Sequence, residues 1–338
     1  MEEQRFDIPV VLIIFKRKKA VEIIQRISLI KPKKLYILGD NGRNKKEKAE
    51  VAEVRKLVEN SINWDCEVIK NYSEENRGVY ANIGLGAKWV FEREEKAIFL
   101  EDDNLPEPTF FEYCREMLDM YENDTRILWV TGTNYLGKYQ PNDGASYMFT
   151  NHLLPCGWAS WSKKFNRFYD TELKLSQNKI MLSRIEKQYY NKKLYKQYKK
   201  SWTSEYQRIE NGERPISWDY HMDFTLKSNG LYGISPRHNQ IKNIGVDEHS
   251  IHGGNSLNDI MTRRFTGMES YPLEFPLKHP STVLPDLVYE EKIGKILMYP
   301  FNLRIRFFIL GKIRRILKIP DGTATKYYFK SKFNKKNN

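Results

Sequence analysis

The chain contains a short apolar run, Ala97–Leu100, that ends abruptly in three consecutive carboxylates, Glu101–Asp103. An uninterrupted apolar run is typical of a strand that is buried on both faces of a parallel sheet. Pro106 and Pro108 follow closely, and proline cannot donate the hydrogen bonds that would extend the strand. The carboxylates are therefore predicted at the carboxyl end of a central strand, where open α/β sheets bind their ligands.

Three adjacent carboxylates repel one another, and they stay ionised together only beside a shared positive charge. Mg²⁺ and Mn²⁺ prefer such oxygen ligands and often complete their coordination with substrate phosphates. The turn therefore indicates a Mn²⁺ or Mg²⁺ site that holds a diphosphate. The competing interpretation is a solvated acidic turn without a ligand.

Strand and helix patterns alternate through the first half of the chain. Continuous apolar runs predict strands, and apolar residues spaced three or four apart predict helices. Their alternation predicts an α/β fold with a doubly wound, mostly parallel sheet flanked by helices. The predicted strands are 8–15, 34–39, 66–70, 97–100 and 127–131, and the predicted helices between them are 19–30, 46–60, 79–93 and 110–121.

The loops after the first three predicted strands are polar and basic, and in this architecture they line one crevice. Guanidinium groups suit phosphate oxygens, so the arginines of these loops are expected to bind a diphosphate. Asp40 is expected to accept a hydrogen bond from a base or ribose, although Asp40-Asn41-Gly42 is equally compatible with an ordinary turn. The candidate nucleotide-sugar-binding residues in these loops are Phe15, Arg17, Asp40, Arg43, Asn76 and Arg77.

The net charge of +13 is unevenly distributed. From Lys292 onward, 13 basic residues stand against the single acid Asp321, so the rest of the chain is nearly neutral. We therefore expect a folded domain over 1–290 and a basic tail over 291–338 that associates with an anionic membrane. Within the domain, the expected parts are a nucleotide-sugar half to about 135, an acceptor half over 136–290 and a helical insertion over 177–210, whose scattered tyrosines indicate a solvated or membrane-facing surface.

Residues 301–319 of the tail have a partly amphipathic helical pattern. A basic amphipathic helix can lie on a bilayer, and the alternative is a helix docked on the body with a basic outer face. No signal peptide or membrane span is apparent, and the three cysteines form no disulfide or zinc pattern. The expected location is therefore cytoplasmic, peripheral on the inner face of the membrane.

Seven motifs occur in order between about residues 8 and 285. They are Pro9–Arg17, Asp40–Arg43, Glu75–Gly78, Leu100–Phe111, Cys156–Trp161, Trp218–Tyr220 and Asn243–His252. In this pattern the chain resembles bacterial GT-A glycosyltransferases of the nucleotide-diphospho-sugar transferase superfamily. It departs from the family's Asp-Gly-Pro-Arg motif by an inserted Asn and a missing Pro at Asp40–Arg43.

The acidic turn and the Trp-Asp pair also resemble those of N-acetylglucosaminyltransferase I. This likeness implies that Asp103 ligates the metal, that Asp102 contacts the ribose side of the nucleotide, and that Asp219 is the catalytic base. Asp223, one helical turn later, competes for that role or lies at the acceptor. His252 is a candidate for a further metal or diphosphate ligand, although a lone histidine is more often structural.

The predicted function is metal-dependent transfer of a sugar, with UDP as the expected carrier by analogy, to a glycan or lipid-linked acceptor in surface polysaccharide or glycoconjugate synthesis. A single base opposite the leaving group predicts inversion of the anomeric centre. Trp158 is expected either to stack on a sugar ring or to pack in the core. The alternatives are a nucleotidylyltransferase, disfavoured because Phe15–Lys19 contains no glycine, and a non-catalytic membrane- or polyanion-binding protein. A neutral body disfavours nucleic acid.

Overall fold

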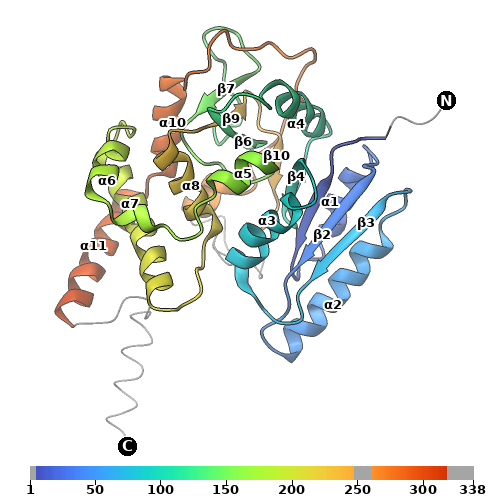
Figure 1. The fold of residues 1–338 in the computed structure, drawn as a ribbon, viewed down its shortest axis with the longest axis horizontal. Coiled ribbons are helices and arrows are strands. Elements are labelled where there is room, and N and C mark those ends of the chain that lie inside the picture. The colour runs from blue at the N-terminus through green and yellow to red at the C-terminus, as the bar shows by residue number, and fades with distance from the viewer. Residues whose placement is uncertain (1–4, 247–259, 318–338) are drawn as a thin grey trace, which may run out of the picture. The chain divides into compact units, whose positions relative to one another are not determined.

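The computed structural model of the chain describes residues 5–246 and 260–317 (Figure 1). The chain divides into two compact units. Unit 1 comprises Met1–Thr171 and Ile216–Ile296, and unit 2 comprises Glu172–Pro215 and Leu297–Asn338. The predicted insertion and the C-terminal segment therefore belong to one unit.

The predicted start of the tail at residue 291 falls inside a helix of unit 1. Helix α10 (Leu287–Leu297) buries Tyr289 and Ile293, and its Glu290 accepts a hydrogen bond from the backbone N–H of Asn151 at 3.1 Å. Residues 291–296 are thus fixed to unit 1 by packing, and the separate C-terminal segment begins at Leu297.

Unit 1 is built on an eight-stranded mixed sheet with the order β3-β2-β1-β4-β8-β6-β9-β7. The first four of these strands are parallel, as predicted, and β4 and β8 pair in antiparallel register. Beyond β8 the sheet is mixed, because β6 is parallel to β9 while β7 is antiparallel to β9. The strands are β1 (Val10–Ile14), β2 (Lys34–Gly39), β3 (Glu67–Tyr72), β4 (Lys96–Glu101), β6 (Ile127–Thr131), β7 (Tyr147–Thr150), β8 (Trp158–Trp161) and β9 (Tyr232–Pro236).

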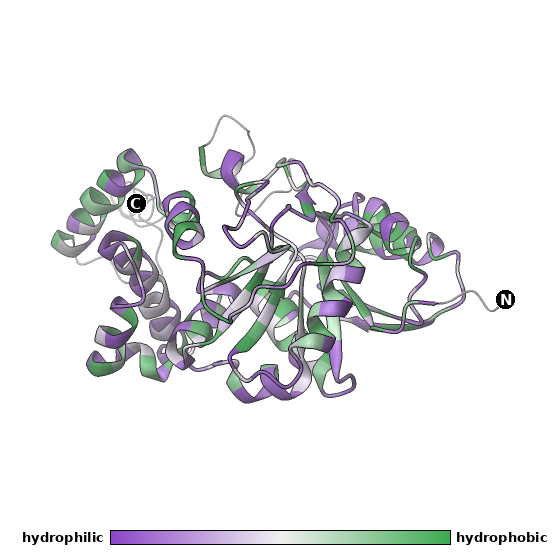
Figure 2. Ribbon diagram, turned by 90° about the horizontal axis from the view of Figure 1, so that it is seen from above, coloured by the Kyte–Doolittle hydropathy of each residue, from purple (hydrophilic) through white to green (hydrophobic). Residues whose placement is uncertain are grey.

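Helices cover both faces of this sheet, which makes three layers. Successive residues of a strand point to opposite faces, so Val10 and Leu12 of β1 enter one core while Val11 and Ile13 enter the other. Figure 2 shows that the central strands are among the more hydrophobic segments. The first core is closed by α1 (Ala20–Ile27), α2 (Lys45–Asn60) and α4 (Thr109–Met120), and the second by α3 (Gly86–Phe91), α5 (Ser162–Phe168) and α8 (Trp218–Asn229).

The predicted helices of the first half are present, with one local difference. The segment predicted as a helix over 79–93 begins with a π-helical turn over Tyr80–Leu85 and continues as α3. A second, two-stranded sheet pairs β5 (Asn104–Pro106) with β10 (Ile241–Asn243) directly after the acidic turn, and α9 (Ile260–Phe265) follows later in the chain.

Unit 2 is helical. It contains a 3₁₀ turn at Lys174–Gln177, α6 (Lys179–Glu186), α7 (Lys192–Glu210) and α11 (Phe301–Ile316). Tyr189 and Tyr195 are buried, and the Tyr195 hydroxyl donates to the Leu182 carbonyl at 3.0 Å. These two tyrosines therefore pack the unit internally, contrary to the predicted solvated or membrane-facing surface. In the described part of the chain, no helix has the length and apolarity needed to cross a bilayer.

Candidate active site

The acidic turn lies where the parallel strands β1 and β4 end together. The register places Ile13 opposite Glu101, so the residues that follow both strands reach the same edge of the sheet. Asp102 is buried and accepts hydrogen bonds from the Phe15 backbone N–H and from the Arg17 guanidinium, both at 3.0 Å. Arg17 also binds Asp103 at 2.9 Å. Phe15, Arg17, Asp102 and Asp103 are thus brought together, as the sequence predicts.

The segment that follows β10 lies directly against this turn. The Ile244 backbone N–H donates to the Asp103 carbonyl at 2.8 Å, and Lys19 Nζ donates to the Ile244 carbonyl at 2.7 Å. A Cβ on Gly245 would clash with Asp103 Oδ2, so any other residue here would displace the Asp103 carboxylate. The role of Gly245 was not predicted, although the Asn243-Ile244-Gly245 motif was the available signal.

The electrostatics of the turn show which groups are close. Burial raises the pKa of Glu101 well above its usual value, and the charges of Asp103, Asp102 and Asp219 raise it further, while Arg17 lowers it. Asp219 lies in the first turn of α8, whose N-cap Ser217 accepts from the Tyr220 backbone N–H at 3.1 Å. The Ser217 hydroxyl also donates to Asp219. Asp219, the base that the resemblance implies, is partly exposed to solvent.

Asp40 is already fully bonded to the protein. It is 5% exposed, and its carboxylate accepts from the backbone N–H groups of Asn41, Arg77 and Gly78 and from the Asn76 side-chain amide, at 2.8–3.0 Å. A carboxylate has about four acceptor positions. The predicted role of Asp40 as an acceptor for a base or ribose is therefore wrong, because no acceptor position of its carboxylate is left. Asp40 and Asn76 instead connect the loops after β2 and β3.

Of the three arginines predicted to line the crevice, only Arg17 bonds to the acidic turn. Arg43 binds Glu47 through Nε at 2.8 Å, and Lys16 Nζ binds the same carboxylate at 3.0 Å. The hydrogen bond from Arg43 holds the pKa of Glu47 well below its usual value. The bond from Lys16 to Glu47 was not predicted from the sequence, although Lys16 lies between the predicted residues Phe15 and Arg17.

Arg77 is half-buried and held by two asparagines. Its guanidinium donates to Asn82 Oδ1 at 2.7 Å and to Asn71 Oδ1 at 3.2 Å, and burial lowers its pKa. The charge of Asp40 partly opposes that shift. Arg77 thus fixes the start of the π-helical turn rather than extending toward the acidic turn.

The two residues predicted at the acceptor lie inside the protein. Trp158 is 1% exposed, and its ring stacks on Phe99 at 3.9 Å and on Trp129 at 4.2 Å between centroids. Both faces of the indole are occupied, so the core interpretation of Trp158 is the correct one. Asp223 is also 1% exposed and lies close to the buried Lys227, whose pKa is lowered by burial and raised again by Glu290 and Asp223. An acceptor hydroxyl does not reach either side chain in this structure.

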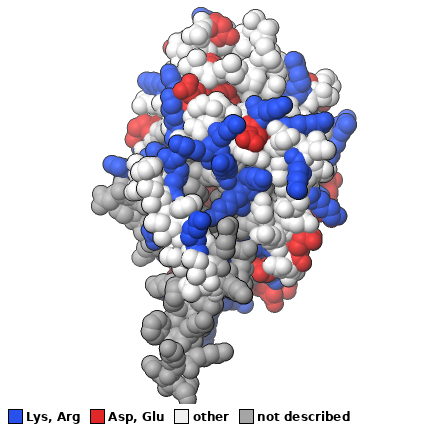
Figure 3. All heavy atoms as spheres, turned by 90° about the vertical axis from the view of Figure 1, so that its left-hand side faces the viewer, with Lys and Arg blue, Asp and Glu red and all other residues white. Residues whose placement is uncertain are grey.

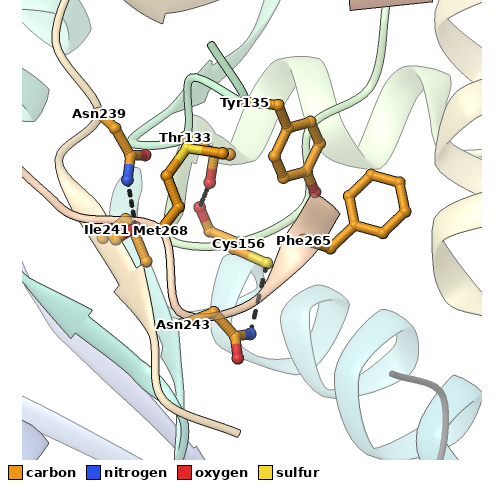
Figure 4. Close-up of a pocket in the computed structure, with 8 residues that line it drawn as sticks. All are labelled: Thr133, Tyr135, Cys156, Asn239, Ile241, Asn243, Phe265 and Met268. Carbon is orange, nitrogen blue, oxygen red and sulfur yellow. Dashed lines mark hydrogen bonds between the residues drawn. The ribbon is translucent and has the colours of Figure 1, made fainter. Parts of the chain in front are cut away.

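A small hollow lies beside the acidic turn (Figure 4). Cys156 lines it, and burial followed by the charges of Glu101 and Asp103 raises the pKa of its thiol. Thr133 donates to the Cys156 carbonyl at 2.6 Å, and Asn243 donates to its sulfur at 3.9 Å. The hollow has room for about one water molecule, so it does not by itself form a sugar pocket. The remaining lining residues are Tyr135, Asn239, Ile241, Phe265 and Met268.

The donor chemistry of the turn fits a divalent cation that is shared with a substrate. Among residues 5–246 and 260–317, no three His, Cys, Asp or Glu side chains converge on a point where they could hold a metal. Asp103 could supply one carboxylate, and one or two carboxylates completed by substrate phosphates and water are a usual Mg²⁺ environment. The predicted ligand His252 lies outside the described residues.

No protein-family model matches the chain, and no curated protein matches it. Solved structures with partial likeness include UDP-glucose pyrophosphorylase in complex with UDP-glucose, with a TM-score of 0.33, 7% identity and coverage of 70% of this chain and 92% of that one. 4-Diphosphocytidyl-2C-methyl-D-erythritol synthase from Anaerococcus prevotii matches with a TM-score of 0.34 and 9% identity, and the match covers 77% of this chain and 95% of that one. Mouse xyloside xylosyltransferase 1 in its apo form matches with a TM-score of 0.34 and 12% identity, and the match covers 67% of this chain and 82% of that one. At these scores the likeness carries no conclusion about this chain.

Proposed function

We propose that the chain is a metal-dependent glycosyltransferase that moves a sugar from a nucleotide-diphosphate donor, with UDP as the expected carrier, to a hydroxyl of a glycan or lipid-linked acceptor. The observation that supports this proposal is the convergence of Arg17, Asp102 and Asp103 at the carboxyl edge of the sheet. The surface-polysaccharide and inner-membrane setting expected from sequence is retained as part of the proposal.

The donor would bind through the ends of β1 and β4. The Arg17 guanidinium can bind two phosphate oxygens at once, which suits a diphosphate. The Phe15 backbone N–H and Arg17 hold the Asp102 carboxylate in a fixed orientation. In this proposal Asp102 would accept from a ribose hydroxyl, and Asp103, which lies against Gly245, would ligate the metal.

Mn²⁺ or Mg²⁺ on Asp103 would offset the charge that develops on the departing diphosphate, which is a Lewis-acid contribution. Asp219 would accept the proton of the acceptor hydroxyl as that oxygen attacks the anomeric carbon. The hydrogen bond from Ser217 orients this carboxylate. A single base on the face opposite the leaving group produces inversion. A product whose anomeric configuration is retained, followed by NMR from the first turnover, would refute this assignment.

Thermal shift with a panel of nucleoside diphosphates and their sugar conjugates, with and without Mn²⁺, tests the donor site. A ligand at 100 times its dissociation constant stabilises the protein by about 2.7 kcal/mol. We expect Mn²⁺-dependent stabilisation by one nucleotide, lost in Asp103→Asn and retained in the matched control Asp65→Asn. Asp65 is an exposed residue of unit 1 that is paired with Arg5. Equal responses of both variants would refute the site.

The identity of the released product separates this function from its alternatives. A glycosyltransferase releases a nucleoside diphosphate, and a nucleotidylyltransferase releases pyrophosphate from a nucleoside triphosphate and a sugar phosphate. Asp219→Asn is expected to lower glycosyl transfer by about 10²- to 10⁴-fold, the usual contribution of a general base, without changing donor affinity. A wild-type protein that binds no nucleotide under any of these conditions would favour the non-catalytic binding protein.

A further inference from the structure

The positive charge of the chain is concentrated in unit 2. This unit contains 22 of the 56 Lys and Arg residues but only 6 of the 43 Asp and Glu residues, a net charge of +16, which leaves unit 1 at −3. The excess is therefore shared between the 172–215 segment and the C-terminal segment. Figure 3 shows a face on which Lys and Arg side chains gather in large numbers.

Helix α11 adds exposed apolar surface to this basic unit. Five of its large apolar residues, at positions 301, 305, 308, 309 and 316, follow helical spacing and lie on one side of the helix, and Phe307 is exposed outside this side. Their exposed fractions are large, at 69% for Phe301, 65% for Phe308 and 77% for Ile316. Leu303 and Leu310 lie on the opposite side and Ile313 at its edge, and all three are half-buried. The helix thus uses one apolar side within the protein and presents another to solvent.

Arg304 borders the exposed side, Lys312 lies within it, and the sequence of α11 contains no acidic residue. The Arg304 guanidinium lies 5.6 Å from the Phe301 ring centroid, and Lys312 Nζ lies 5.6 Å from that of Phe308. A side that combines apolar residues with cationic side chains matches an anionic lipid interface, where acyl chains receive the rings and headgroups receive the charges. A nucleic acid would satisfy the charges alone, because it offers no apolar phase for Ile305, Ile309 and Ile316.

We propose that unit 2 docks on the surface of an anionic phospholipid membrane, with the Phe301, Ile305, Phe308, Ile309 and Ile316 side of α11 inserted at the acyl boundary. The helix lies in the plane of the interface, and the basic residues of unit 2 bind headgroup phosphates. The surface is on unit 2, so docking is independent of the candidate active site on unit 1 and can be tested without the donor or the acceptor.

The test is flotation of the full chain with vesicles of phosphatidylcholine containing 30% phosphatidylserine, beside vesicles of phosphatidylcholine alone, in physiological salt. We expect strong binding to the anionic vesicles and at least tenfold weaker binding to the neutral ones. The double variant Phe308→Ser and Ile309→Ser should bind the anionic vesicles about tenfold more weakly. Arg304→Gln with Lys312→Gln should lose about fivefold per residue.

The matched control is Leu29→Ser, which removes an equally exposed apolar residue (61%) from unit 1. This variant should bind as wild type, and all variants should keep the wild-type unfolding temperature. Equal binding to neutral and anionic vesicles, or no effect of Phe308→Ser with Ile309→Ser, would overturn the proposal. Binding of single-stranded polyuridylate that is tighter than vesicle binding and insensitive to that double variant would overturn it in favour of nucleic acid. A stable dimer dissociated by the same variant would show that a second copy covers the side.

Discussion

Replacing Asp40 tests whether this residue supports the fold or binds the nucleotide. Asp40→Ala removes an acceptor from four donors: the backbone N–H groups of Asn41, Arg77 and Gly78 and the amide of Asn76. Each donor that is left unsatisfied in a buried setting costs about 1–3 kcal/mol, and water can reach part of these loops. We therefore expect a loss of about 3–4 kcal/mol in the free energy of unfolding.

Urea unfolding followed by tryptophan fluorescence measures this loss. Asp40→Asn keeps the shape and one acceptor oxygen, so its cost should be smaller, at about 2 kcal/mol. Asp143 is the matched control, because it is exposed and its carboxylate accepts from one backbone N–H, that of Ala145 at 3.0 Å. Asp143→Ala should cost less than about 1 kcal/mol. An Asp40→Ala protein with wild-type stability and lost nucleotide binding would refute the structural role.

Three further predictions concern other residues of unit 1. Arg43 and Lys16 hold the pKa of Glu47 below its value of about 4.3 in an unfolded chain, so the ionised carboxylate stabilises the fold above that pH. The urea midpoint of Glu47→Gln should therefore lie below that of wild type at pH 7, and the difference between the two midpoints should shrink steadily below pH 4. A difference that does not change with pH would contradict this. Gly245→Ala should displace Asp103 and weaken Mn²⁺-dependent nucleotide binding about tenfold, whereas Gly311→Ala, with open space around it, should not. Trp158→Ala should lower the free energy of unfolding by about 3–5 kcal/mol, while Trp158→Phe should keep the acceptor KM; a raised KM without loss of stability would restore a sugar-stacking role.

The parallel half of the sheet follows from local sequence pattern. Strands β1, β2 and β4 are continuous apolar runs separated by helical periodicity, so each could be assigned from its own window. In the mixed half, β6 was predicted from its own window, but β7 and β8, which contain only four residues each, were not predicted. Their pairing with β9 and β4 depends on partners far along the chain. Trp158 was therefore predicted as a possible sugar-binding residue, although it belongs to a buried strand.

The candidate site was likewise predicted only in part. The acidic turn and Arg17 were predicted correctly as neighbours, because the ends of adjacent parallel strands meet at one edge whatever the details of the loops. The partners of Asp40, Arg43 and Arg77 were not predicted. Arg43 and Arg77 bond to residues near them in sequence, whereas Asp40 bonds across to the loop after β3, and turn sequences do not show which of these bonds form.

The position of Arg17 bears on how a donor could enter the site. Its guanidinium lies between the carboxylates of Asp102 and Asp103, at 3.0 and 2.9 Å, and offsets part of their repulsion in the free protein. A diphosphate that arrives alone would bring two further negative charges to this edge. A diphosphate that arrives with a divalent cation adds almost no net charge, so Arg17 can turn from Asp103 to a phosphate oxygen while Asp103 remains beside a cation. The charge balance therefore predicts that donor and metal bind together, and that each raises the apparent affinity for the other by the same factor.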